Sequence, residues 1–191
     1  MPLRTPTVYI VDDDEAMRDS ISELISSMPM PLETYSAGKE FLETHHAGRA
    51  GCVVLDLRMP ILSGIQVQNA LLQSEPQLPI IFITAHGDAA TAVRAMKSGA
   101  VDFLQKPFLA QDLWDAVQRA IAIDHSNRCT EYERSELNRR LQSLTPGEVS
   151  VLDLMLEGMI NKQIAARLDL SVRTIELRRA SLLKKMQVET V

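Results

Sequence analysis

The chain of 191 residues has room for one large domain or for two modest ones. Hydrophobic residues make up 46% and charged residues 24%, a balance that supplies buried cores and argues against disorder. No apolar run approaches the roughly 20 residues that span a bilayer, and we find no secretory signal pattern. Cys52 and Cys129 form neither a metal nor a disulfide pattern, so we expect two free thiols in a cytoplasmic protein without membrane partners.

The net charge of −5 is distributed unevenly along the chain. Residues 1–122 carry 9 Lys and Arg side chains against 15 Asp and Glu, whereas residues 143–191 carry 7 against 6. Within the second region, 171–187 holds five basic residues and a single acidic one, Glu176. A basic segment of helical length in an acidic chain indicates a candidate contact with nucleic acid.

The first 123 residues alternate β-rich apolar runs with segments of helical periodicity. The runs around Val8, Val53 and Ile81 are apolar on both faces, as in a parallel sheet covered by helices. Five such βα units predict a doubly wound α/β domain whose active site lies at the carboxyl ends of the strands. The predicted strands are Val8–Val11, Leu32–Tyr35, Cys52–Leu55, Ile80–Thr84 and Val101–Leu104, and the predicted helices are Glu15–Met28, Lys39–Thr44, Ile65–Ser74, Ala89–Ser98 and Asp112–Ile123.

Residues 124–142 are charged and free of Gly and Pro, so we predict a helical linker between residues 1–123 and a second domain, 143–191. A coiled-coil seam along this linker is an alternative, with few heptads to support it. The second domain begins with Thr145–Glu148, which has capping-box spacing and places Pro146 at the first helical position. Its first helix is expected to bury the apolar face formed by Val149, Leu152, Leu156 and Met159.

Two further helices are predicted in this domain, Asn161–Leu168 and Val172–Met186, with Ser171 as the N-cap of the last one. Two consecutive short helices, the second with a basic exposed face, describe a helix-turn-helix. The alternative interpretation is that these charges only solvate a surface helix.

A set of polar residues lies at the ends of the predicted strands of the first domain. Because carboxyl ends of parallel strands share one edge of a sheet, we expect these side chains to converge there. Three carboxylates in one cleft repel each other and need a cation, and oxygen ligands without sulfur favour Mg²⁺. One carboxylate can then act as nucleophile towards a phosphoryl group. The set consists of Asp12, Asp13, Asp56, Thr84 and Lys106.

Three other classes of protein would explain part of this pattern. A haloacid-dehalogenase-type phosphatase needs a second Asp two residues after its nucleophile, where this chain has Arg58. A flavin-binding module needs a phosphate loop after the first strand, where Asp13, Asp14 and Glu15 would repel an anionic cofactor. A sigma-factor-like protein would explain the tail and leave residues 1–123 without a role.

The conjunction of motifs resembles a two-component response regulator of the FixJ/NarL class, with a LuxR-type helix-turn-helix. The resemblance implies a five-stranded, flavodoxin-like receiver with strand order 2-1-3-4-5 and a small all-α DNA-binding domain. It implies a phosphorylation-controlled transcriptional regulator and not a turnover enzyme. The motifs are Val11–Asp13, Leu55–Pro60 with Gly64, Phe82–Ala85 and Lys106–Phe108 in the receiver, and Leu144–Pro146, Asn161–Ala165 and Thr174–Glu176 in the tail.

By this resemblance Asp56 accepts a phosphoryl group from a sensor histidine kinase. Asp13, Asp56 and the backbone carbonyl of Arg58 would bind Mg²⁺ directly, with Asp12 acting largely through water. Thr84 and Lys106 would bind the phosphoryl group and Ala85 would leave it access. Phe103 matches the aromatic side chain that turns inward when Thr84 moves.

The resemblance also implies partners for the output. Phosphorylation would promote a homodimer that binds double-stranded DNA, with RNA polymerase as a possible further partner. The expected phosphate and groove contacts are Lys162, Arg173, Thr174 and Arg178, and Glu176 and Leu177 would face base edges. The charged residues expected at the rim of the dimer are Arg94, Lys97, Asp102, Asp112 and Arg119.

Overall fold

The computed structural model describes residues 5–46, 48–73, 77–85 and 89–188. The chain divides into two compact units, Met1–Cys129 and Thr130–Val191, here called the N-terminal unit and the C-terminal unit. In the described part of the chain, no helix combines the length and the apolar character needed to cross a bilayer.

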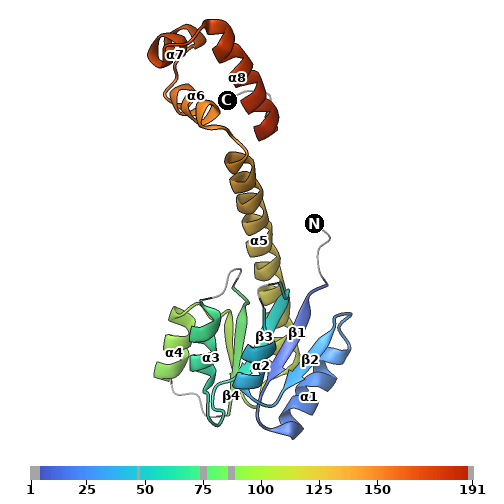
Figure 1. Ribbon diagram of the computed structural model, residues 1–191. Coiled ribbons are helices and arrows are strands. Elements are labelled where there is room, and N and C mark those ends of the chain that lie inside the picture. The colour runs from blue at the N-terminus through green and yellow to red at the C-terminus, as the bar shows by residue number, and fades with distance from the viewer. Residues whose placement is uncertain (1–4, 47, 74–76, 86–88, 189–191) are drawn as a thin grey trace. The chain divides into compact units, whose positions relative to one another are not determined.

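The N-terminal unit is built on a five-stranded parallel sheet with the order β2-β1-β3-β4-β5 (Figure 1). The strand order reverses between β1 and β3, and folds of this kind bind ligands outside the carboxyl ends of the strands at that point. The predicted fold class and strand order are therefore confirmed. The strands are β1 (Thr7–Val11), β2 (Leu32–Tyr35), β3 (Gly51–Asp56), β4 (Ile80–Thr84) and β5 (Asp102–Gln105).

Helices cover both faces of this sheet, because side chains alternate along each strand. Val8 and Ile10 of β1 share a core with α1 (Glu15–Ser26) and α5 (Ala110–Gln142). Tyr9 and Val11 of the same strand face the opposite core, shared with three shorter helices. Strands β1, β3 and β4 are almost wholly buried as a result, which explains their continuous apolar sequence. The shorter helices are α2 (Gly38–Thr44), α3 (Gly64–Leu71) and α4 (Ala89–Lys97).

Helix α5 is much longer than the predicted helix Asp112–Ile123 and contains the whole predicted linker, 124–142. Asp124 is only 2% exposed, and its carboxylate accepts hydrogen bonds from the backbone N–H of Gly51, at 2.9 Å, and from Nε of Arg128. Arg128 also donates to the carbonyl oxygen of Arg49. These bonds attach the first turns of the expected linker to the amino-terminal edge of the sheet, and the first compact unit extends to residue 129.

The C-terminal unit contains α6 (Pro146–Leu156), α7 (Asn161–Leu168) and α8 (Val172–Met186) at the predicted positions. Thr145 forms the predicted capping box at the start of α6, and the Ser171 side chain caps α8. The three helices enclose a small core of their own.

The predicted apolar face of α6 is wrong. Val149 and Leu156 are exposed, whereas Val151, Leu154 and Met155 are buried against α7 and α8. Apolar side chains occupy nearly every side of α6, so two stripes fit helical periodicity equally well. Packing against α7 and α8 decides which of the two stripes is buried.

Glu148 joins the start of α6 to α8. Its side chain is buried and accepts hydrogen bonds from Nζ of Lys185 and Oγ of Ser181, each at 2.6 Å, and from the backbone N–H of Thr145 at 2.7 Å. These donors, Lys185 first, hold the pKa of the Glu148 carboxyl at about 2. The recognition of α6 by α8 therefore includes an ion pair whose carboxylate is buried and whose lysine is partly exposed.

Candidate functional site

Two carboxylates and an ammonium group meet at the carboxyl edge of the sheet. Asp12 follows β1 and is 1% exposed, and Asp56 ends β3 and is 6% exposed. Nζ of Lys106, just after β5, donates to Oδ2 of Asp12 at 2.8 Å and to Oδ1 of Asp56 at 3.0 Å. Thr84, at the end of β4, is buried, and its carbonyl accepts from the backbone N–H of Lys106 at 2.8 Å. The structure thus assembles four of the predicted residues at one end of the sheet.

The electrostatics of this cluster are dominated by burial. Burial raises the pKa of the Asp56 carboxyl, although Lys106 and the backbone N–H of Arg58 oppose that shift. Burial works against the charge of Lys106, but its hydrogen bonds with Asp12 and Asp56 prevail and raise its pKa. One cation therefore faces two buried carboxylates, and the cluster is left with excess negative charge.

The other residues predicted for this site lie around the cluster. Asp13 is exposed next to Asp12, and Ala85 is exposed directly after Thr84. The side chain of Arg58 is exposed, while its backbone N–H donates to Oδ2 of Asp56 at 2.7 Å. Phe103 is half-buried against the core beneath α2, α3 and α4. Within the described ranges, no three Asp, Glu, His or Cys side chains come together as a metal site.

Two residues of the loop and helix that follow β1 escaped prediction. Asp14 caps α1, accepting from the backbone N–H groups of Ala16 and Met17. Arg18, in the second turn of α1, donates from Nη1 to the carbonyl oxygen of Asp12 at 2.7 Å. The N-cap had a sequence signal, because an Asp directly precedes the helix, whereas nothing in the sequence pattern distinguishes Arg18 from other helix-surface arginines.

The loop after Asp56 contains a backbone outlier at Ile61. Its φ is +67°, and the N–H of Leu62 donates to the carbonyl of Pro60 at 2.7 Å, which is the geometry of a strained three-residue turn. The Ile61 side chain is 94% exposed and so gains little by burial. A branched residue in the left-handed region is therefore held here at a cost in free energy.

We expect Ile61→Gly to raise the free energy of unfolding of the N-terminal unit by about 1 kcal/mol, because glycine adopts positive φ without a Cβ clash. Urea titration monitored by the fluorescence of Trp114 measures this free energy of unfolding. Ile61→Ala is the control, since it removes the exposed side chain but keeps the Cβ, and should recover much less. Equal stabilisation by both variants would show that side-chain exposure, not φ, sets the cost.

The C-terminal unit presents a stripe of exposed residues along α8. Arg173, Glu176 and Leu177 belong to it, as predicted for groove contacts. Ala180 and Lys184 continue the same face at helical spacing and were missed, although the periodicity of the sequence would have indicated both. Arg173 lies 3.5 Å from Glu176 in an exposed ion pair, so the charges of the stripe are partly paired within the helix.

Two predicted contact residues do not share this stripe. Arg178 is half-buried, and a Cβ placed on Gly147 of α6 would lie 2.7 Å from its Nη1, so its guanidinium covers the start of α6. Thr174 is half-buried in the first turn of α8, where its backbone N–H donates to Oγ of Ser171, the N-cap, at 3.0 Å. Both residues therefore also make contacts within the helical unit.

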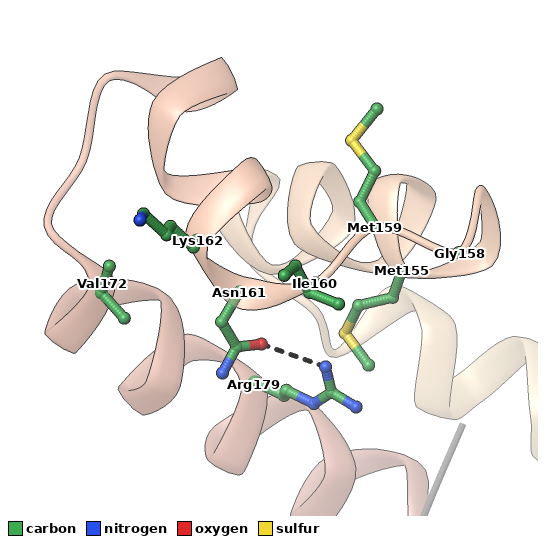
Figure 2. Close-up of a pocket in the computed structure, with 8 residues that line it drawn as sticks. All are labelled: Met155, Gly158, Met159, Ile160, Asn161, Lys162, Val172 and Arg179. Atoms are coloured by element: carbon green, nitrogen blue, oxygen red, sulfur yellow. Dashed lines mark hydrogen bonds between the residues drawn. The ribbon is translucent and has the colours of Figure 1, made fainter.

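A hollow of about 570 Å³ lies beside the start of α7 (Figure 2). Figure 2 shows Arg179 of α8 reaching across it to Asn161, and the structure gives 3.1 Å between Nη1 and Oδ1. Lys162, the predicted phosphate contact, follows Asn161 and is exposed. Arg179 therefore links the two helices of the helix-turn-helix next to that lysine.

Two family models match this chain. The response regulator receiver domain matches residues 8–118, which hold the acidic cluster, and the luxR family of bacterial regulatory proteins matches residues 142–190. The chain belongs to the response regulators. The predicted resemblance is confirmed, and the regulator is a phosphorylation-controlled transcription regulator whose receiver implies a sensor kinase and whose LuxR-type domain implies DNA as partners.

Relatives resemble the regulator along nearly its whole length. The response regulator protein TodT of Pseudomonas putida is 39% identical over 98% of this chain and 83% of TodT. The C4-dicarboxylate transport transcriptional regulatory protein DctR of Rhodobacter capsulatus is 41% identical over 97% of this chain and 95% of DctR. The solved structure of response regulator StyR superposes with a TM-score of 0.90 at 39% identity, covering 97% of this chain and 94% of StyR.

The charged residues expected at a dimer rim are only partly available in the regulator. Asp102 of β5 and Arg119 of α5 form an ion pair with each other within one chain. Arg94 and Lys97 are exposed on the last turns of α4, and Asp112 is exposed on the first turn of α5.

Proposed function

We propose that Asp56 accepts a phosphoryl group from a phosphohistidine of a sensor histidine kinase, with Mg²⁺, and that this promotes a homodimer which binds DNA through α8. The observation that carries the proposal is the bridge from Lys106 to Asp12 and Asp56. It holds a buried carboxylate beside a cation, which is the arrangement that an acyl phosphate requires. We propose RNA polymerase as a further partner of the DNA-bound form.

The residues present suit Mg²⁺. The buried cluster has two carboxylates against one ammonium and offers only oxygen ligands, and Mg²⁺ prefers oxygen and usually takes one or two carboxylates while keeping several waters. Asp13, Asp56 and the carbonyl of Arg58 would hold it, with Asp12 acting through water. When bound, the ion would offset the negative charge of the carboxylates and of the incoming phosphoryl group.

The chain's own groups then have separate tasks. A carboxylate oxygen of Asp56 forms the new P–O bond while the P–N bond of the phosphohistidine breaks and its electron pair returns to the imidazole. Lys106 faces the oxygens of the transferred group, and the hydroxyl of Thr84 binds one of them. Ala85, exposed and small, leaves the donor room. In this proposal the regulator acts as a phosphoryl acceptor that loses the phosphoryl group only slowly by its own hydrolysis, and not as a turnover enzyme.

The new charge of about −1.5 to −2 on Asp56 would change the packing behind it. Thr84 moves towards the phosphoryl group and Phe103, now half-buried, follows inward. These shifts repack the surface of α4, β5 and α5, where two copies pair. Pairing would bring two α8 helices to half-sites about one DNA turn apart.

Sedimentation of the full chain tests the pairing step. With Mg²⁺ and beryllofluoride, a phosphoryl mimic, we expect a dimer at tens of micromolar, and without them mostly monomer with a small dimer fraction, because a ligand shifts an existing equilibrium. Asp56→Asn is the control and should show the same small dimer fraction in both conditions. A chain that binds the mimic and remains a monomer would show that phosphorylation acts without pairing.

The DNA contacts can be separated by their salt dependence. Arg173→Ala and Lys162→Ala should weaken binding to all sequences and reduce the slope of log K against log salt by about one unit each. Glu176→Ala should instead alter base preference at one position, by roughly 1–3 kcal/mol. Fluorescence anisotropy with a duplex selected for binding, and with single-base variants of it, measures both. A uniform loss from Glu176→Ala would reverse the assigned roles.

A further inference from the structure

We propose that Arg18 is a positioning residue for the cation site: it fixes the β1–α1 loop so that Asp12 and Asp13 present their carboxylates to Mg²⁺. The inference rests on the proposed function, because it assumes that this site binds Mg²⁺. Arg18 lies outside the receiver residues assigned above to phosphoryl or metal binding, and it comes from a helix, not from a strand end.

The contacts of Asp12 show what Arg18 contributes. All three oxygens of this residue accept hydrogen bonds: the carbonyl oxygen from Nη1 of Arg18 at 2.7 Å, Oδ1 from the backbone N–H of Asp14 at 2.9 Å, and Oδ2 from Lys106 at 2.8 Å. The backbone N–H of Asp12 donates to the carbonyl of Tyr35 on β2 at 3.2 Å. Arg18 supplies the bond that ties the end of β1 to the body of α1.

Among the hydrogen bonds of the described residues, no other side chain of α1 donates to the backbone at the end of β1. Asp14 caps the first turn of α1, which fixes where the helix begins. The side chain of Arg18 is half-buried and spans six residues back to Asp12, so it sets how the helix start lies against the strand end. Asp13 stands between these two anchors and is exposed, and its position depends on both.

If Arg18 acted only as a positive charge near the site, it would weaken cation binding and not support it. Removing a cation beside an acidic cluster makes the cluster more negative and strengthens its attraction for Mg²⁺. Removing a group that holds the ligands in place weakens it, and losses of about tenfold or more are usual for residues that orient metal ligands through hydrogen bonds. If Arg18 acts only through its charge, its removal should lower the Kd for Mg²⁺. If it positions the ligands, its removal should raise that Kd.

The experiment is an NMR chemical-shift titration of the full chain with MgCl₂ for the wild type, Arg18→Met, Arg18→Lys and the control Arg134→Met. Methionine keeps most of the aliphatic stem and loses the charge and the donors. Lysine keeps the charge and loses the planar donor fork. Arg134 is exposed on the part of α5 that belongs to the C-terminal unit, so Arg134→Met makes the same chemical change as Arg18→Met without touching the loop.

We expect the Kd for Mg²⁺ to rise about tenfold in Arg18→Met, to rise less in Arg18→Lys, and to stay near the wild-type value in Arg134→Met. Phosphate uptake from acetyl phosphate should be slow in Arg18→Met at low Mg²⁺ and recover at saturating Mg²⁺, as a loss of cation affinity requires. Far-UV circular dichroism verifies folding, and if Arg18→Met does not fold, Arg18→Lys decides.

Each other outcome has a definite meaning. An unchanged or lower Kd in Arg18→Met, with Arg18→Lys like the wild type, would overturn the positioning role and leave the proposed Mg²⁺ site standing. Uptake that stays slow at saturating Mg²⁺ would also overturn it, because Arg18 would then act on the transfer itself. A wild type without any Mg²⁺-dependent shift would instead refute the cation site of the proposed function.

Discussion

Replacement of Asp56 by asparagine is expected to abolish phosphate uptake from acetyl phosphate. Asparagine has nearly the same shape and can still accept from the backbone N–H of Arg58, so the fold should persist. It lacks the anionic oxygen that attacks phosphorus, and its amide is far less nucleophilic than a carboxylate. Intact-protein mass spectrometry after incubation with acetyl phosphate and Mg²⁺ measures the uptake directly.

The matched control for this substitution is Asp13→Asn, which makes the same chemical change one loop away. It should need more Mg²⁺ for uptake and still reach the wild-type mass. The phosphate on the wild type should be stable in acid and released by base, as an acyl phosphate is. Phosphate on the Asp56→Asn variant would move the acceptor to another residue and remove the basis of the proposed mechanism.

In the C-terminal unit, the largest effect on stability is expected from Glu148→Gln. The change leaves Lys185 without its buried carboxylate partner and weakens the bonds from Ser181 and Thr145. The shift in the Glu148 pKa from 4.5 to about 2 sets an upper limit of about 3 kcal/mol on the loss, and we expect about 1–2 kcal/mol because Lys185 is 32% exposed and solvent screens the pair. Because Trp114 lies in the N-terminal unit and is the only tryptophan, hydrogen exchange of α6 and α8 amides is the measurement that isolates this unit.

The same carboxyl predicts a dependence on pH. The folded-state pKa is depressed, so Glu148 contributes its full stabilisation above about pH 4.5, and the contribution is lost as the pH falls towards 2. The Glu148→Gln variant should lose less stability than the wild type over that interval. Ser150→Ala is a suitable control, because Ser150 is on the same helix and its hydroxyl donates to the carbonyl of Pro146 within that helix. If the wild type and Glu148→Gln lose the same amount of stability between about pH 4.5 and 2, the pH dependence does not come from Glu148.

The sequence predicted the sheet and the acidic cluster well because both depend on simple periodic rules. Continuous apolar runs such as Cys52–Leu55, alternating with helical segments, are typical of central strands of a covered sheet, and a polar residue that ends such a strand lies at the edge of the sheet. Asp12, Asp56 and Lys106 are separated by many residues, yet the parallel topology alone brings them together.

Features that depend on a particular neighbour could not be predicted in this way. The buried stripe of α6 was ambiguous until α7 and α8 covered one side of it, and the partner of Arg178 was unknown until α8 packed over Gly147. The composition of 124–142 resembles a solvated linker, and the one acid that is buried there, Asp124, looks like every other acid in the segment. Ile61 gives no sign of a positive φ, because its residue type disfavours that conformation.

The attachment of Asp124 and Arg128 to Gly51 and Arg49 bears on how this regulator can be recombined with others. A chimera joined at residue 118, where the receiver family model ends, would take both side chains away and leave the buried N–H of Gly51 without its acceptor. A fusion joined after Cys129 carries the whole attachment with the receiver. The exchangeable module in this protein therefore includes the first turns of its connector, and an interchange of output domains would preserve the switch only if it respects that longer boundary.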